Sequence, residues 1–181
     1  MVIQPKTFVR DQFSYVIRSA KEEDAAHLAE VRLQIDGETE NLDREKGEAY
    51  LSEAGFLELI KEDTDRPNHL FLVAEADNRL VGFSRCEGSN LKRFAHKAEF
   101  GIGILKAYWG HGIGKNLLKT SLEWADANAV KKMTLNVLET NDSAIQLYKK
   151  CGFEVEGVLK KDKRLSDGLY YNTIVMGRWK E

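Results

Sequence analysis

The sequence predicts a single α/β (α+β) domain in which a mixed, mostly antiparallel sheet of six to seven strands is flanked by about four helices. Three observations predict it. The 181 residues, 43% apolar and 31% charged, suit one globular domain. Strand-like and helix-like hydrophobic patterns follow one another in the order β-α-α-β-β-β-α-β-α-β-β. The step from residue 96 to residue 138 places a helix between two strands, which implies a parallel pair with a crossover helix.

The N-terminal third is expected to hold one strand and two helices. The strand covers residues 13–18, and Ser19 with Glu22 three residues later matches a capping box that would open the first helix. The apolar stripe of this helix is Ala25, Leu28, Ala29 and Leu33. A second helix is expected over residues 45–61, and its buried face comprises Tyr50, Leu51, Phe56, Leu57 and Ile60.

The remaining elements follow from residue 69 onward. Two runs, 69–76 and 80–85, flank the turn residues Asp77-Asn78 and are expected to form a hairpin. Asn141 is expected to cap a short helix that ends near Lys150. The other expected elements are strands over 96–105, 133–138, 152–158 and 170–178 and a helix over 113–128.

Composition excludes several functional classes. The net charge of -2 argues against a nucleic-acid partner, whose binding domain would be strongly basic. Cys86 and Cys151 are too few for a disulfide framework and lack metal-ligand spacing, so we expect a reducing compartment and no metal. Residues 1–10 do not match a secretory signal, and no apolar run approaches the length of a membrane span. We therefore expect a cytoplasmic protein without a membrane partner.

The near-neutral total hides two oppositely charged regions. Residues 1–62 contain 8 basic and 14 acidic residues, a net charge of -6, whereas residues 63–181 contain 19 and 15, a net charge of +4. Nine of the acids lie between Asp36 and Glu62. This acidic stretch is either a solvated surface or a region that attracts a cationic ligand.

Three glycines connect the strand that ends near Leu105 to the helix that follows. Gly110, Gly112 and Gly114 alternate along the chain, which favours positive φ and lets successive N–H groups converge at a helix N-terminus. Such a site binds anions, and phosphate is the expected ligand. The spacing fits neither a Walker P-loop nor a dinucleotide-binding fingerprint.

Two motifs together resemble the GNAT family of N-acetyltransferases. The run Gly112-Ile113-Gly114 matches that family's pyrophosphate loop [QR]-x-x-G-x-[GA], except that Trp109 stands where Gln or Arg is commonest. The family's later pattern N-x-x-A-x-x-L-Y-x-x-x-G-F is matched in full by Asn141, Ala144, Leu147, Tyr148, Gly152 and Phe153. The C-terminal part resembles the branch with ribosomal-protein and small-amine acetyltransferases. The resemblance implies an N-terminal extension over residues 1–14 and an acetyltransferase domain over residues 15–178.

The resemblance also implies acetyl-coenzyme A as cofactor. Ile104 and Leu105 match the strand end that pairs with pantetheine, Asn141 a residue near the pantetheine arm, and Tyr148 a tyrosine near the sulfur. The residues implied to contact the cofactor are Ile104, Leu105, Trp109, Gly110, His111, Gly112, Ile113, Gly114, Lys115, Asn141, Ser143 and Tyr148.

Acetyl transfer from a thioester to an amine requires a base for the amine proton, N–H donors for the carbonyl oxygen and a donor for the leaving thiolate. Tyr148 is the candidate acid, and the alternative is a core tyrosine on an amphipathic helix. Glu99 is the candidate base, because the resemblance implies that its strand position faces the acceptor cleft, and alternation with Gly101 and Gly103 suggests an open strand face. The alternatives are a surface glutamate and a water chain. Ile104 or Leu105 is the candidate N–H donor.

The acceptor implied by the resemblance is a primary amine, either a cationic small molecule drawn to the acidic stretch or a peptide N-terminus. The expected reaction is direct attack in a ternary complex, and a homodimer is compatible with the family. Two other functions remain open from the sequence. One is a regulatory or structural protein that binds coenzyme A without turnover, and the other is a nucleotide-binding protein.

Overall fold

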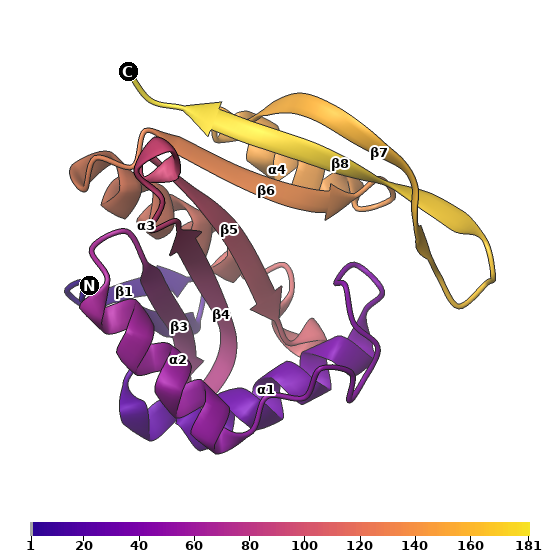
Figure 1. Ribbon diagram of the computed structural model, residues 1–181. Helices are drawn as coiled ribbons and strands as arrows, with labels where there is room; N and C mark the ends of the chain where they lie inside the picture. The colour runs from indigo at the N-terminus through magenta and orange to yellow at the C-terminus, as the bar shows by residue number, and fades with distance from the viewer. Residues whose placement is uncertain (1) are drawn as a thin grey trace.

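The computed structural model describes residues 2–181, which form an eight-stranded sheet with the strand order β1-β2-β3-β4-β5-β6-β8-β7 (Figure 1). The fold class is as expected, with one strand more than the upper estimate. The strands are β1 (Lys6–Arg10), β2 (Phe13–Ser19), β3 (Leu70–Ala76), β4 (Arg79–Gly88), β5 (Lys97–Ile104), β6 (Lys132–Leu138), β7 (Glu154–Arg164) and β8 (Tyr170–Trp179).

Four α-helices accompany the sheet in the described chain, as predicted. They are α1 (Ala25–Glu38), α2 (Glu53–Asp65), α3 (Ile113–Ala127) and α4 (Asp142–Lys150), with short 3-10 turns at Glu22–Asp24, Lys92–Phe94 and Lys106–Tyr108. Asn141 caps α4 as expected, because its Oδ1 accepts a hydrogen bond from the Ala144 N–H at 3.4 Å. No helix of residues 2–181 has the length and apolarity that a membrane crossing requires.

The parallel step lies between β5 and β6, and all other neighbouring strands are antiparallel. The parallel pairing is short, since it joins only residues 97–99 of β5 to residues 132–134 of β6. Beyond Glu99 the two strands diverge and leave a V-shaped gap in the middle of the sheet (Figure 1). The backbone groups along both edges of this gap are therefore available to a ligand.

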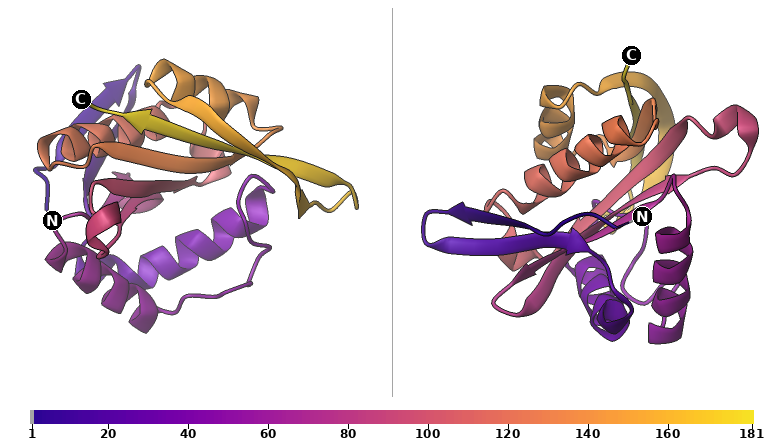
Figure 2. Two further views of the ribbon diagram at one scale, coloured as in Figure 1. Left: turned by 45° about the horizontal axis from the view of Figure 1, so that its top comes forward. Right: turned by 90° about the vertical axis from the view of Figure 1, so that its left-hand side faces the viewer.

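Helices cover both faces of the sheet, α1 and α2 on one and α3 and α4 on the other (Figure 2). Each face has its own hydrophobic cluster. Leu28, Ile35 and Phe56 pack in the cluster beneath α1 and α2. Leu117, Leu118 and Met133 pack in the cluster beneath α3 and α4. We call the two sides of the molecule the α1/α2 side and the α3/α4 side.

The capping box predicted at Ser19 is wrong. Ser19 is the last residue of β2, and its Oγ accepts a hydrogen bond from the Ile3 N–H at 2.9 Å. The chain turns at Lys21, whose N–H donates to the Asp24 carboxylate at 2.8 Å, and α1 begins at Ala25. Leu28 and Ala29 are buried as expected, but Leu33 is only half-buried. Because β2 extends one residue further than predicted, Ser19 belongs to the strand and does not cap the helix.

The second helix begins eight residues later than predicted. Residues 46–49 form a turn, with Gly47 and Ala49 at positive φ, and Ser52 is the N-cap of α2. Phe56 and Ile60 are buried as expected, whereas Tyr50 is 60% exposed. The segment between α1 and α2 is therefore a long connection, and its residues reach the site described below.

The N-terminal segment adds a strand that the expected element order lacks. β1 pairs along its whole length with β2 and lies at the edge of the sheet, within the residues assigned to an extension. The turn at Asp77-Asn78 is confirmed, since both residues have the positive φ that a type I′ hairpin requires. β7 runs six residues beyond its predicted end and forms a long hairpin with β8 (Figure 1).

Candidate functional site

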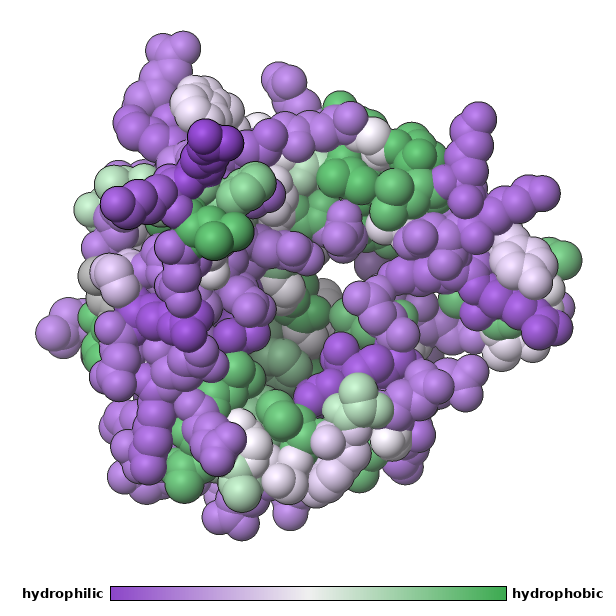
Figure 3. All heavy atoms as spheres, in the orientation of Figure 1, coloured by the Kyte–Doolittle hydropathy of each residue, from purple (hydrophilic) through white to green (hydrophobic). Residues whose placement is uncertain are grey.

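A cavity of about 660 Å³ lies where β5 and β6 diverge, within the size range of small-molecule sites. Figure 3 shows this hollow near the centre of the molecular face, with hydrophobic residues visible inside it and hydrophilic residues around it. Both sides of the sheet contribute to the cavity wall. Residues of α4 and of the glycine loop (109–114, except His111) line it from the α3/α4 side, and Thr39, residues 41–44 and two β4 residues line it from the α1/α2 side.

The glycine loop has the predicted anion-binding geometry. Gly110 and Gly112 have φ values of +83° and +84°, and Gly112 is the N-cap of α3. The first intrahelical bond runs from the Asn116 N–H to the Gly112 carbonyl at 3.0 Å, and no side chain caps the helix. The preceding amides therefore lack intrahelical partners, and they meet the positive end of the helix dipole. Gly114 lies within the helix, where a Cβ would come within 3.1 Å of Ile104.

The end of β5 presents a mixed set of backbone groups. The Leu105 N–H donates to the Val81 carbonyl at 2.9 Å, so this amide is not free to bind a ligand. By the alternation of an antiparallel ladder, the amides of Ile102 and Ile104 then point away from β4 toward the gap. The Ile104 carbonyl accepts from the Trp109 indole N–H at 2.9 Å, which holds the exposed Trp109 across the strand end.

Tyr148 reaches the cavity from α4. The residue is 8% exposed and packs on Phe153, and it lines the cavity beside Asn141 and Ser143. Burial raises the pKa of Tyr148 to about 12. Burial is the one cause of this shift, and no hydrogen bond to another described residue contributes to it. A phenol with this pKa is protonated throughout the physiological range, so its hydroxyl has a proton available for a hydrogen bond.

Glu99 stands at the apex of the gap, where β5 and β6 make their last pairing. It lies on the α1/α2 side, because β5 residues of odd number share the face of Gly103, which packs against Ile35 of α1. The side chain is exposed, and within the described chain no ion pair involves it. A Cβ at Gly101 would have nothing within 4 Å, so the face beside Glu99 is open.

Nearly all the sequence-predicted site residues line this one cavity. Leu105 and His111 are not part of its wall: Leu105 is 5% exposed in the α1/α2 core, and the His111 ring packs on Phe13 at 4.5 Å between centroids. The predicted residues that line the cavity are Glu99, Ile104, Trp109, Gly110, Gly112, Ile113, Gly114, Lys115, Asn141, Ser143 and Tyr148.

Three cavity arginines have no counterpart in the sequence analysis. Arg10 belongs to β1, and its Nη1 donates to the Gly110 carbonyl at 2.7 Å. Arg44 lies in the connection between α1 and α2, and Arg85 lies in β4 directly opposite Gly101. Isolated arginines give no local signal, and only strand register and the path of the connection bring them to the cavity.

The acidic stretch is largely engaged in internal contacts. Asp36 pairs with Arg44, Glu38 accepts the Lys106 N–H at 2.7 Å, and Glu40 accepts the Ser166 N–H at 2.8 Å. Asp43 pairs with Lys163 at the tip of the β7–β8 hairpin. Of these four acids only Asp43 lines the cavity.

The sequence model of the Acetyltransferase (GNAT) family matches residues 36–153 of this chain. The L-amino acid N-acetyltransferase AaaT of Escherichia coli strain K12 is 35% identical over 117 residues, which is 64% of this chain and 72% of that protein.

Solved structures give the same result for the fold. An acetyltransferase of the GNAT family from Streptococcus pneumoniae superposes with a TM-score of 0.88 at 26% identity, covering 92% of this chain and 99% of that one. A putative acetyltransferase from Salmonella typhimurium, solved with its cofactor acetyl-CoA, has a TM-score of 0.81 at 18% identity, with 92% and 94% of the two chains covered.

Proposed function

This chain belongs to the acetyltransferase (GNAT) family and is an acetyl-coenzyme A-dependent N-acetyltransferase; from that premise we propose that it acetylates a primary amine by direct attack in a ternary complex. One observation carries the proposal. A single cavity joins an anion-binding helix N-terminus, a protonated tyrosine and an exposed carboxylate across the gap between β5 and β6. The E. coli relative, named for L-amino acids, supports a small amine as acceptor.

The α3/α4 side of the cavity fits coenzyme A. The free amides at the start of α3 suit a pyrophosphate, and Lys115 and Arg10 add positive charge beside them. The amides of Ile102 and Ile104 face the gap, where they suit the carbonyl groups of the pantetheine arm and the thioester. When bound, acetyl-coenzyme A supplies an acetyl group on a thiolate leaving group.

Tyr148 acts on the leaving sulfur. With acetyl-coenzyme A bound, negative charge would develop on its sulfur as the C–N bond forms and the C–S bond breaks, and the Tyr148 hydroxyl would donate a hydrogen bond to that sulfur. An unperturbed thiol has a pKa of about 8.5, well below the value of about 12 for Tyr148, so complete proton transfer from this tyrosine is unfavourable. Its contribution is therefore stabilisation of the thiolate by a hydrogen bond.

Glu99 receives the amine proton. Five residues separate it from Ile104, which corresponds to about 16 Å along an extended strand. The reacting carbon must therefore lie along the gap, between Glu99 and the end of β5, for the carboxylate to act directly or through one water molecule.

Thiol release from acetyl-coenzyme A tests the proposal, measured with a panel of primary amines. The variant Tyr148→Phe is expected to lower kcat about 100-fold while the KM for acetyl-coenzyme A changes less than about 3-fold. Glu99→Gln is expected to lower kcat/KM for the amine about 10-fold or more. Glu58→Gln is the control, because Glu58 is an exposed glutamate of α2 that does not line the cavity. Binding of acetyl-coenzyme A without turnover of any amine would contradict the proposal.

A further inference from the structure

The α1/α2 side of the cavity carries two arginines, Arg44 and Arg85, and their surroundings indicate which class of acceptor the cavity can bind. Arg85 faces the open position at Gly101 and is a diagonal neighbour of Glu99 across β4 and β5. Diagonal neighbours on one sheet face lie about 7–8 Å apart, within reach of long side chains. A small molecule that meets Glu99 therefore also meets a guanidinium group.

Arg44 is held in place by a buried carboxylate. Asp36, whose side chain is 3% exposed, accepts hydrogen bonds from Nε and Nη2 of Arg44, both at 3.2 Å. This side-on pairing leaves Nη1 without a partner among residues 2–181. The side chain is 30% exposed and lines the cavity. Arg44 is thus oriented by the fold and retains free donors.

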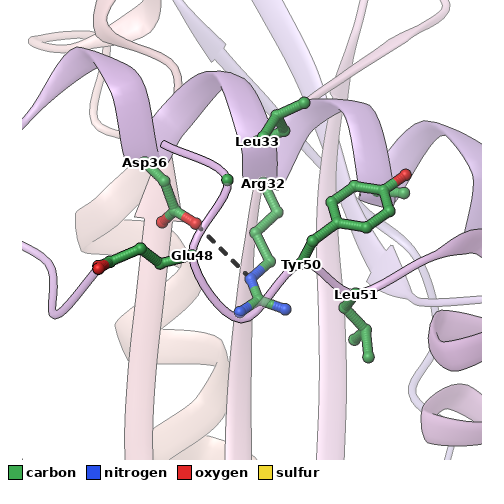
Figure 4. Close-up of a pocket in the computed structure, with 8 residues that line it drawn as sticks. Arg32, Leu33, Asp36, Glu48, Tyr50 and Leu51 are labelled. Carbon is green, nitrogen blue, oxygen red and sulfur yellow. Dashed lines mark ion pairs between the residues drawn. The ribbon is translucent and has the colours of Figure 1, made fainter. Parts of the chain in front are cut away.

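A second arginine shares the same carboxylate. Arg32 lies one turn before Asp36 on α1, and its Nε is 3.8 Å from Asp36 Oδ2 (Figure 4). Burial and the neighbouring Arg44 charge lower the pKa of Arg32. Two guanidinium groups therefore face one carboxylate, which leaves about one positive charge beside the cavity. The space around Arg32 is a separate pocket of about 10 Å³, too small for a ligand.

Arg85 has a similar arrangement. Asp63, 1% exposed, accepts hydrogen bonds from Nε and Nη2 of Arg85 at 2.6 and 2.9 Å. Asp63 is shared with His69, whose Nδ1 lies 2.7 Å from Asp63 Oδ1 and whose Nε2 donates to the Gly88 carbonyl at 3.0 Å. Glu87 accepts from Nη1 of Arg85, yet the arginine side chain stays 23% exposed and lines the cavity.

These charges disfavour a polycationic acceptor. Of the two acids that line the cavity, Asp43 is paired with Lys163, which leaves Glu99 to meet the amine itself. Any second cationic group on the acceptor would face Arg44, whereas the charge of Arg85 is already balanced by Asp63 and Glu87. A guanidinium fork held side-on by a buried carboxylate is instead a good partner for a planar anion.

We propose that the acceptor is a free amino acid, whose amine faces Glu99 and whose carboxylate is bound by Arg44. This inference rests on the proposed function. It differs from the cationic acceptor that the acidic stretch predicts, because that stretch is mostly engaged within the fold.

The test compares acceptors that differ in their carboxylate. Thiol release from acetyl-coenzyme A is measured with the standard L-amino acids, with the amides of the best substrates, with spermidine, and with a peptide that has a free N-terminus and an amidated C-terminus. A charged hydrogen-bonded contact contributes roughly a 10- to 100-fold effect, so kcat/KM should be at least about 10-fold higher for the amino acid than for its amide. The amine of the amide is less basic than the amine of the amino acid, so a larger fraction of it is in the neutral, reactive form. This difference favours the amide, so it cannot explain a higher kcat/KM for the amino acid.

Variants of Arg44 and Arg32, the two arginines that pair with Asp36, show which residue is responsible for the preference for a carboxylate. Arg44→Gln is expected to raise the KM for the amino acid about 10-fold, with the KM for acetyl-coenzyme A and the activity toward the amide nearly unchanged. Arg44→Lys should recover part of the loss. Arg32→Gln is the comparison variant: it removes a charge beside the same carboxylate but does not line the cavity, so it should weaken the preference for the carboxylate clearly less than Arg44→Gln does.

The outcomes separate the two proposals. Turnover of spermidine, the amide or the peptide as fast as the amino acid overturns the amino-acid acceptor while the acetyl-transfer function stands. An equal loss in Arg32→Gln and Arg44→Gln also overturns it, since the effect would then come from the shared buried carboxylate. If acetyl-coenzyme A raises the thermal stability of the protein but no amine is acetylated, the proposed function fails, and the acceptor inference with it.

Discussion

On the α3/α4 side of the cavity one continuous stretch, residues 104–115, forms much of the wall, whereas on the α1/α2 side Arg44, Arg85 and Glu99 come from three separate segments. Backbone geometry dominates the first side: two left-handed glycines and the uncapped start of α3. Charged side chains anchored by buried acids dominate the second. A ligand bound mainly by backbone amides leaves a local motif in the sequence, whereas one bound by dispersed side chains does not.

Gly112→Ala tests the role of the local backbone and should have the largest effect of the changes considered next. A Cβ at Gly112 would meet nothing closer than 3.6 Å, so the cost is backbone strain at φ +84°, about 1–2 kcal/mol. Part of this strain relaxes by moving the loop amides, and we expect the Kd for acetyl-coenzyme A, measured by calorimetry, to rise about 10-fold. Gly168→Ala, at φ +80° in the β7–β8 turn, should lose similar stability without any change in Kd. An equal effect on Kd from both would argue against a loop-specific role.

Arg10→Ala tests how far the α3/α4 side depends on the local motif alone. Arg10 comes from the N-terminal strand β1 yet contacts the glycine loop at Gly110, so a distant segment contributes here too. We expect the KM for acetyl-coenzyme A to rise about 3- to 10-fold at low ionic strength, with a smaller effect in high salt because the guanidinium is exposed. Lys6→Ala is the control, since Lys6 lies on the same strand but pairs with Glu123. If both variants change KM alike, the effect comes from the stability of the hairpin.

Tyr148→Phe at alkaline pH concerns the burial of the side chain that we propose to act on the leaving sulfur. Burial raises the pKa of Tyr148 to about 12, above its unfolded value, so its contribution to stability is complete below pH 10 and is lost as the pH rises toward 12. Thermal melts should show the wild-type free energy of unfolding falling by up to about 1.4 kcal/mol per pH unit in this window from this group. Tyr148→Phe should lose less stability there, and Tyr50→Phe, at an exposed position, should match the wild type. Burial also raises the pKa of Cys86 to about 12, so this thiol contributes to the loss of stability that remains in Tyr148→Phe at alkaline pH.

The predicted elements that matched the structure are those with a strong local signal. The Asp77-Asn78 turn, the Asn141 cap and the amphipathic α3 each depend on residues within a few positions of one another. The errors arose where a distant partner decided the outcome. Ser19 accepts a hydrogen bond from Ile3 instead of capping a helix, and residues 45–52 form a connection whose neighbour Arg44 is fixed by Asp36.

By itself the sequence determined the glycine loop, the helix that follows it and the resemblance carried by the motif from Asn141 to Phe153, because each is a local arrangement of backbone and adjacent side chains. The tertiary structure decided the divergence of β5 and β6, the occupied amide of Leu105, and the arrival of Arg10, Arg44 and Arg85 at one cavity. Strand register and buried ion pairs set these features, and both join residues far apart in the chain. The residues that we propose to select the acceptor are therefore brought together by tertiary contacts, and their order in the sequence does not predict that they meet.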